Sequence, residues 1–336
     1  MRPTWKIAII CLLVFTIAGG VIFSLPSLYI VGIKNIESQS ATATVEQFPV
    51  TVDPKNKVIA ENANVDMYLE SSHSPLQASV IVGAGNIFWK LFEIVATAID
   101  NAPWYQSLAG TNGRFVAITA GMRKEQVASA FGSALNWSST DKKAFLTPAG
   151  TSTFPLPEGS FAPNVYFVGS GTTGAEAQAL VNEKFQGDVL EHYGSTTASI
   201  VPLHDALTIA SMVERETTRP EDMRLIAGII WNRIFINMRL QIDATLQYAK
   251  ANTYQIGSWW PRVVSSDKYI KSPFNTYLHP GLPPNPIANP SVAAIVAALN
   301  PLKTSCLYYF NDKSGTFHCS DTYAQHVALI KKFYGQ

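Results

Sequence analysis

An uncharged, apolar run near the N-terminus constrains this chain more than any other feature of its sequence. No charged residue occurs from Ile7 to Ile33, and residues 7–25 are mostly Ile, Leu, Val, Ala and Phe. A helix of that length crosses a hydrocarbon core of about 30 Å, so the run predicts a transmembrane anchor or an export signal. A cleavable signal usually has a shorter apolar core, whereas this run continues through Ile30. The run therefore favours an uncleaved anchor, which comprises residues 1–33.

The charges around this run predict its orientation. Arg2 and Lys6 precede it, and only Lys34 follows it closely. Because positive charge is retained on the cytoplasmic side, we expect the N-terminus inside and the remaining chain outside the cytoplasm.

Composition indicates a globular protein and excludes some classes of partner. The chain has 336 residues, of which 47% are hydrophobic and 15% charged, with a formal net charge of +1. Such a balance provides no basic field for a nucleic-acid backbone, so no nucleic-acid partner is expected. The histidines form neither a His-x-His nor a His-Glu-x-x-His spacing, so we predict no metal site and no cofactor.

Two cysteines form a candidate disulfide. Cys306 and Cys319 flank the turn-like residues 311–314 symmetrically, so a hairpin centred there places them opposite each other. A disulfide suits an oxidising compartment, and two buried free thiols are the alternative reading.

The remaining chain divides into a spacer (34–47), a membrane-proximal region (48–150) and a C-terminal domain (151–336). A dense apolar stretch over 87–99 predicts a buried helix. Residues 114–119 predict a strand, followed by a turn and a helix with one apolar face, formed by Val127, Ala128, Phe131 and Leu135. This small α/β module is LysM-like, and modules of this kind either bind glycan or serve as packing units.

A glutamate lies in line with the apolar face of a predicted helix in the C-terminal domain. Leu207 and Glu214 are seven residues apart, and seven residues turn a helix by about 700°, only about 20° short of two full turns. Glu216 is two residues further on, which turns the helix by about 200°, so it should face the other way. Thr218-Arg-Pro-Glu221 has the form of a capping box, so a second helix should begin there and end near Asn237.

The last third of the chain predicts a loop, a helix and a hairpin. The prolines of residues 280–286 exclude helix and central strand. Asn289-Pro290 should cap a helix over residues 292–299, and a hairpin with a closing helix over 323–333 should follow.

Burial decides whether Glu214 is a surface acid or a reactive one. In an apolar cleft the ionised carboxyl loses its hydration, so its pKa rises and the group holds a proton for a leaving oxygen. Cleavage of a glycoside needs such an acid. A hydrolase adds a second carboxylate, whereas a transglycosylase uses the sugar's own 6-hydroxyl and works with one.

Several blocks around Glu214 resemble the MltG (YceG-like) family of endolytic murein transglycosylases. They are Ala210-Ser-Met-Val-Glu-Arg-Glu-Thr217, Ile229-Ile-Trp-Asn-Arg-Ile234, Met238-Arg-Leu-Gln-Ile-Asp-Ala-Thr245, Ser272-Pro-Phe-Asn-Thr-Tyr277, Gly281-Leu-Pro-Pro-Asn-Pro-Ile287 and Leu307-Tyr-Tyr-Phe310. The resemblance covers about residues 155–330. It implies an α+β protein whose catalytic domain mixes helices and a β-hairpin, with Glu214 as the catalytic acid.

The resemblance also implies a substrate and a location. The expected reaction cleaves peptidoglycan glycan strands between N-acetylmuramic acid and N-acetylglucosamine and leaves 1,6-anhydro ends. The expected partners are glycan strands and, beside them, peptidoglycan synthases. The expected location is the cytoplasmic (inner) membrane, crossed once, with the catalytic domain on the periplasmic or extracytoplasmic side.

Other polar residues of these blocks are candidates for binding sugar. We expect Gln241, Asp243 and Thr245 to line the cleft, with Asn275 and Tyr277 on an opposing loop. Structural hydrogen bonds are the alternative role for each of these five. For His318 and His326, packing or pinning of the hairpin is favoured over catalysis.

The sequence departs from the family pattern at a few positions and leaves other functions to be weighed. Asn164, Asn237 and Ala244 stand where the family usually has Asp, Gly and Pro, and Ala120 stands where Glu is common. Ser-x-x-Lys patterns suggest a serine acyl-transfer enzyme, but they occur twice and lack a Ser-x-Asn partner. The serious rival is a non-enzymatic, membrane-anchored scaffold that binds peptidoglycan.

Overall fold

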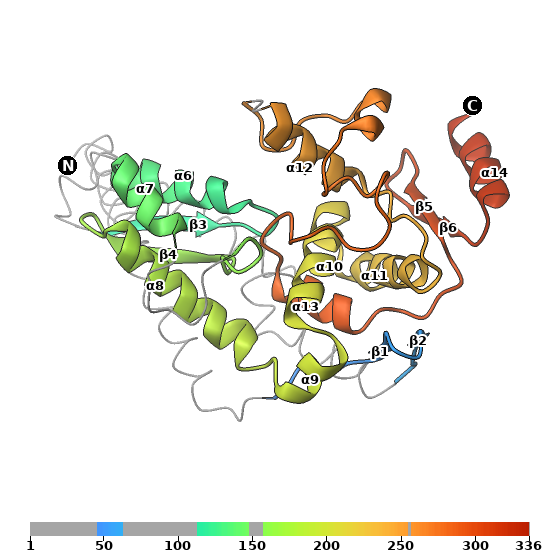
Figure 1. Ribbon diagram of the computed structural model, residues 1–336, viewed down its shortest axis with the longest axis horizontal. Helices are drawn as coiled ribbons and strands as arrows, with labels where there is room; N and C mark the ends of the chain where they lie inside the picture. The colour runs from blue at the N-terminus through green and yellow to red at the C-terminus, as the bar shows by residue number, and fades with distance from the viewer. Residues whose placement is uncertain (1–45, 63–112, 148–156, 255–256, 336) are drawn as a thin grey trace, which may run out of the picture.

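The structure is a computed structural model that describes residues 46–62, 113–147, 157–254 and 257–335 (Figure 1). This described part is α+β and mostly helical, and its three sheets are two-stranded, β1–β2, β3–β4 and β5–β6. The predicted anchor and the predicted helix over 87–99 lie outside these residues. Within the four described ranges, no helix is long and apolar enough to cross a membrane.

The predicted strand–turn–helix module is present and is completed by a later strand. Its elements are β3 (Gly113–Ile118), α6 (Lys124–Leu135), α7 (Ser139–Leu146), β4 (Asn164–Gly169) and α8 (Gly174–Phe185). β3 pairs with β4 in antiparallel register, with Phe115 opposite Phe167. β4 lies beyond residue 150, so the module draws a strand from the far side of the predicted domain boundary. Figure 1 shows these elements grouped on one side of the molecule.

Aromatic side chains fill the core of this module. Phe131 and Phe145 are 0% exposed, with ring centroids 5.1 Å apart, and Phe161 lies 5.4 Å from Phe145. The four residues predicted for the apolar face of α6 are all buried, which confirms the helical periodicity. Phe161 and β4 follow residue 157, so the packing ties this module to the C-terminal part of the chain.

A helical core lies beside this module. It comprises η1 (Gln186–Leu190), a π-helical turn, followed by α9 (Ser195–Ile200), α10 (Leu203–Glu216), α11 (Pro220–Phe235), α12 (Asp243–Tyr254), η2 (Ser265–Tyr269), a 3₁₀ turn, and α13 (Val292–Leu299). α13 consists only of Val, Ala, Ile and Leu, because it packs against both α10 and α11. Trp231 of α11 donates its indole N–H to the Ala298 carbonyl oxygen at 2.9 Å.

The ends of these helices differ in part from the predicted ones. The Thr218 capping box is wrong, because the N-cap of α11 is Arg219, whose side chain accepts no capping hydrogen bond, and Pro220 takes the first helical position. Asn237 is left-handed with φ 56°, which confirms the predicted stop. The helix over 292–299 is confirmed, but its cap is Ser291, whose hydroxyl accepts from the Ala294 N–H, and not Asn289-Pro290.

Two further hairpins flank the helical core. β1 (Val52–Asp53) pairs with β2 (Val58–Ile59), and the Thr51 N–H donates to the Leu299 carbonyl oxygen at 3.1 Å. The second hairpin is formed by β5 (Tyr308–Asn311) and β6 (Phe317–Ser320), and α14 (Tyr323–Tyr334) follows it as predicted.

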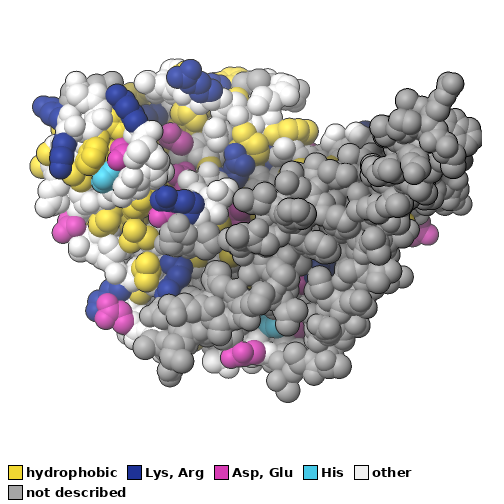
Figure 2. Space-filling model, turned by 180° about the vertical axis from the view of Figure 1, so that it is seen from behind, with side chains coloured by type: hydrophobic (Ala, Val, Ile, Leu, Met, Phe, Trp, Pro, Cys, Tyr) yellow, Lys and Arg dark blue, Asp and Glu magenta, His cyan; other side chains and the backbone are white. Residues whose placement is uncertain are grey.

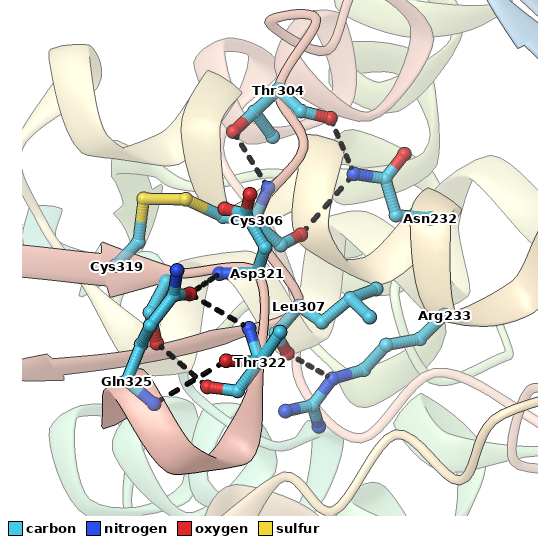
Figure 3. The surroundings of a disulfide bond; sticks show 10 residues. Asn232, Arg233, Thr304, Cys306, Leu307, Cys319, Asp321, Thr322 and Gln325 are labelled. Atoms are coloured by element: carbon cyan, nitrogen blue, oxygen red, sulfur yellow. Dashed lines mark hydrogen bonds between the residues drawn. A yellow bond between two sulfur atoms is a disulfide. The ribbon is translucent and has the colours of Figure 1, made fainter. Parts of the chain in front are cut away.

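Cys306 and Cys319 form a disulfide (Figure 3). The register differs from the predicted one, because Cys319 is opposite Tyr309 and Cys306 precedes β5. The bond therefore runs diagonally from the entry of the hairpin to its second strand. Asn232 and Arg233 of α11 bind the carbonyl oxygens of Cys306 and Leu307, at 3.2 and 2.7 Å, which joins this hairpin to the helical core.

The two histidines of this region pack as predicted. His318 contacts an Asp312 carboxylate oxygen through Nε2 at 2.8 Å and stacks on Phe310 with ring centroids 5.2 Å apart. His326 lies against Tyr308 and Phe310. On the described part of the face in Figure 2, basic and acidic side chains are scattered among hydrophobic ones, in keeping with the small net charge.

Candidate active site

Glu214 occupies the last turn of α10 and is only 9% exposed. Leu207 and Ala210, on the same face of the helix, are buried with it, as the periodicity predicted. The turn between β3 and α6 packs against this acid, since a Cβ at Gly121 would lie 3.8 Å from the Glu214 Cγ. Gly121 has φ +81°, a conformation that favours glycine. Because glycine has no side chain, the turn approaches the acid closely at this position.

One oxygen of the Glu214 carboxyl receives two hydrogen bonds from Ser291. The backbone N–H donates to Oε2 at 3.0 Å, and the hydroxyl donates to the same oxygen at 2.6 Å. Oε1 accepts no hydrogen bond from any residue in the described ranges. Because donors favour the unprotonated oxygen, the proton of the neutral acid belongs on Oε1.

Burial raises the pKa of Glu214 above its ordinary value of 4.5. The two hydrogen bonds from Ser291 and the positive charge of Arg215 act in the opposite direction and stabilise the ionised form. The site therefore supports both protonation states, which a group serving first as an acid and then as a base requires.

A cationic and aromatic wall stands beside the acid. The Arg215 guanidinium carbon lies 3.9 Å from the Trp260 ring centroid, and the Trp260 indole N–H donates to Gln126 Oε1 of α6 at 3.0 Å. Arg123, 3% exposed, lies in the same way over the ring of Tyr248, at 4.1 Å. The contacts of Gln126 and Arg123 connect the module to Trp260, which follows α12, and to Tyr248 of α12 itself.

Of the five predicted sugar-binding residues, Gln241 and Asp243 are exposed and Tyr277 is half-buried. Gln241 is exposed and left-handed, with φ 51°, and its N–H donates to the Thr276 carbonyl oxygen at 3.1 Å. Asp243 is exposed at the start of α12, where Oδ1 accepts from the Tyr277 hydroxyl at 2.7 Å. The structure thus brings Asp243 and Tyr277 together, from two segments of the chain.

The other two, Thr245 and Asn275, are 0% exposed. The Thr245 hydroxyl donates to the Ile242 carbonyl oxygen at 2.6 Å and lies 2.9 Å from the Thr276 hydroxyl. The Asn275 side-chain amide donates to the carbonyl oxygens of Lys268 and Ile270 at 3.1 and 2.9 Å. These arrangements match the structural alternative, in which both residues hold loops in place.

Glu216 faces away from Glu214, as the helical geometry predicted, but it meets a second polar cluster there. The Tyr309 hydroxyl, from β5, donates to Glu216 Oε2 at 2.9 Å. Burial raises the pKa of Glu216, and the nearby charge of Asp243 raises it further. Sequence reasoning missed this cluster because Tyr309 is separated from Glu216 by 93 residues.

Sequence reasoning also missed Ser291. A serine directly before an apolar helical run is a common N-cap, so its capping role was readable. Its contact with Glu214 was not, because the two residues are 77 positions apart.

Comparisons with known proteins agree with this fold. Over 177 residues the chain is 34% identical to the endolytic murein transglycosylase of Bacillus subtilis (strain 168), covering 52% of this chain and 48% of that protein. It is 33% identical over 158 residues to the protein of the same name from Streptococcus pneumoniae serotype 2 (strain D39), covering 46% of this chain and 28% of that protein. The matched part thus spans about half or less of the length of these relatives.

A solved structure and a family profile extend the match beyond these relatives. The crystal structure of a putative YceG-like protein from Listeria monocytogenes has a TM-score of 0.56 and 26% identity, covering 64% of this chain and 75% of that one. The sequence profile of the YceG-like family matches residues 91–332. That range includes the module, α10 with Glu214 and the disulfide hairpin, and it shows that the chain belongs to the YceG-like family.

Proposed function

We propose that this chain is an endolytic lytic transglycosylase of peptidoglycan, with Glu214 as its single catalytic acid and base. The observation that carries the proposal is the buried carboxyl whose Oε2 takes both donors of Ser291, while Oε1 accepts no hydrogen bond from the described residues. The names of the two relatives, both endolytic murein transglycosylases, support the same reaction.

The reaction follows from the two oxygens of Glu214. The proton on Oε1 passes to the oxygen that bridges N-acetylmuramic acid and N-acetylglucosamine, and the bond from that oxygen to C1 breaks. The carboxylate then removes the proton from the 6-hydroxyl of the same muramic acid, whose oxygen bonds to C1. The 1,6-anhydro end forms without water, and Glu214 regains its proton.

Ser291 supports the charged stage of this cycle. When Glu214 has lost its proton, two donors already point at Oε2, so the carboxylate is stabilised without rearrangement.

The proposed location is the outer side of the cytoplasmic membrane, with residues 1–33 as an uncleaved anchor. The uncharged run and its preceding basic residues support this location, and a Cys306–Cys319 disulfide suits an oxidising compartment. Anchored there, the enzyme would trim or terminate nascent strands beside the synthases that polymerise them.

Incubation of the full chain with purified sacculi tests the proposal. Mass spectrometry should detect anhydromuropeptides, and Glu214→Gln should reduce their release by about 10²- to 10⁴-fold, because a general acid contributes that much. Glu183→Gln, the same change at an exposed position of α8, serves as the control and should leave release unchanged.

Two results would contradict the proposal in different ways. Equal anhydro product from Glu214→Gln and the parent would show that another residue carries the chemistry. A parent that sediments with sacculi but releases no anhydro product would favour the non-enzymatic scaffold.

A further inference from the structure

Asn289 lies where three segments of the chain meet, and it is 0% exposed. Its side-chain oxygen accepts from the N–H groups of Gly159 and Phe161, both at 2.9 Å. Its backbone pairs with the turn between β3 and α6, since its oxygen accepts from the Gly121 N–H and its N–H donates to the Met122 oxygen, both at 2.8 Å. Its own segment, the β3–α6 turn and residues 159–161 are therefore fixed to one another.

Glu158 extends this network to the first turn of α6. Its Oε1 accepts from the Asn289 side-chain amide at 3.2 Å and from the Lys124 N–H at 2.9 Å. The Glu158 residue is 5% exposed, so these bonds are shielded from competing water. The network is thus a buried clasp between the module and the segment that leads into α13.

Only Pro290 separates Asn289 from Ser291, the residue that holds Glu214. Proline fixes its φ near −65°, so a displacement of Asn289 is passed on to Ser291 with little freedom to absorb it. A buried asparagine with this many backbone partners is also a rigid reference point.

We propose that Asn289 is a positioning residue for Glu214: it fixes residues 289–291 so that both donors of Ser291 reach Oε2 and Oε1 stays free for the substrate. This inference rests on the proposed function, because it assigns Asn289 a part in that same acid–base cycle. Asn289 itself need not touch the substrate.

The pH dependence of activity distinguishes positioning from ordinary stabilisation. The hydrogen bonds from Ser291 lower the pKa of Glu214, so their loss raises this pKa. The high-pH limb of the kcat/KM profile then moves to higher pH. The charged groups on the surrounding described elements are Arg215 of α10, Arg123, Lys124 and Glu125 at the start of α6, and Glu158 beside Asn289. α13 contributes no charge.

The experiment compares Asn289→Ala, Ser291→Ala and the double variant in the full chain. Each single change should move the limb upward by about one pH unit, the value of one hydrogen bond to a charged group. The double variant should move it by less than the sum of the two single shifts, because both changes remove the hydrogen bond from the Ser291 hydroxyl. Repeating the series in a Glu158→Gln background removes the titrating acid of the clasp and should give the same shift of the limb.

Asn300→Ala is the matched control. Asn300 is also 0% exposed, lies at the opposite end of α13 and donates to the carbonyl oxygens of Pro49 and Val296. Its loss should lower stability and leave the limb in place. A folded Asn289→Ala protein with an unshifted limb would overturn the proposal, as would additive shifts in the double variant.

Two provisions keep the test decisive. If Asn289→Ala does not fold, Asn289→Ser takes its place, since a shorter hydroxyl cannot serve Gly159 and Phe161 together. If the parent shows no turnover, the proposed function fails, and the positioning is still read without substrate. Carbon-13 NMR titration of the Glu214 carboxyl should then show the same upward pKa shift in Asn289→Ala, and an unchanged titration would refute it.

Discussion

Replacing Glu158 by glutamine should make the protein more stable at high pH. The pKa of Glu158 is raised to about 8 from an ordinary value of 4.5, first by burial and then by the nearby charge of Glu125. The Lys124 N–H and the charges of Arg123 and Lys124 act the other way, but burial prevails. At neutral pH the folded protein therefore holds a proton on Glu158 that the unfolded chain has lost.

The sign of the effect follows from proton binding. Between pH 4.5 and about 8 the native state binds one proton more at this site than the unfolded state, so the free energy of unfolding falls as pH rises. The stabilising effect is complete below pH 4.5 and lost above about 8. The gap corresponds to at most about 5 kcal/mol, because one pH unit is worth about 1.4 kcal/mol.

Glutamine keeps the acceptor oxygen that Lys124 and Asn289 use and cannot ionise, so it mimics the protonated acid. Urea unfolding, followed by tryptophan fluorescence at several pH values, gives the difference in unfolding free energy between Glu158→Gln and the parent. This difference should be small at pH 4.5 and rise by several kcal/mol, within the limit of about 5, towards pH 9. Other groups titrate in both proteins and cancel.

Glu183→Gln is the control for the amide itself, since Glu183 is exposed on α8 and its difference curve should be flat. A flat curve for Glu158→Gln over the same range would show that Glu158 does not hold a proton in the folded state. The reasoning from its burial would then be wrong.

Two other predictions concern the hairpin and the turn beside the acid. Replacing Cys306 and Cys319 together by serine opens a loop with a sequence separation of 13, so the free energy of unfolding should fall by about 3 kcal/mol. Thiol titration of the unfolded parent should find no reactive thiol at these positions without reductant. Gly121→Ala should lower stability by about 1–3 kcal/mol and also reduce turnover, because the new Cβ lies 3.2 Å from Arg215 Nη1 at a φ of +81°. Gly281→Ala, with φ +77° and no atom within 4 Å, isolates the backbone strain, so equal turnover losses in the two variants would refute the role of the Arg215 contact.

Local patterns accounted for most elements in the described part of the C-terminal half. The spacing of Leu207 and Glu214 placed the acid on the buried face of α10, and the left-handed Asn237 marked the end of α11. The helix over 292–299 and the closing hairpin were also predicted. These features depend on periodicity and turn chemistry within a few residues, which a single sequence displays directly.

Predictions that needed exact partners were less successful. The Thr218 capping box did not form, and the hairpin register placed Cys319 opposite Tyr309 instead of Cys306. Thr245 and Asn275 carry polar groups that the sequence alone assigns equally to a cleft or to a loop. The structure buries both and satisfies them internally, since a buried polar group must find a hydrogen-bond partner.

By itself, the sequence determined that Glu214 would lie along an apolar helical face and that the chain resembles the YceG-like family. Only the tertiary structure decided what holds that acid: Ser291 lies 77 residues from Glu214, and Asn289 lies 130 residues from Gly159. Contacts of that range arise when separate helices, turns and loops pack together, and no local rule of spacing encodes them. The pKa of Glu214 depends on these contacts, because burial raises it and the two hydrogen bonds from Ser291 lower it.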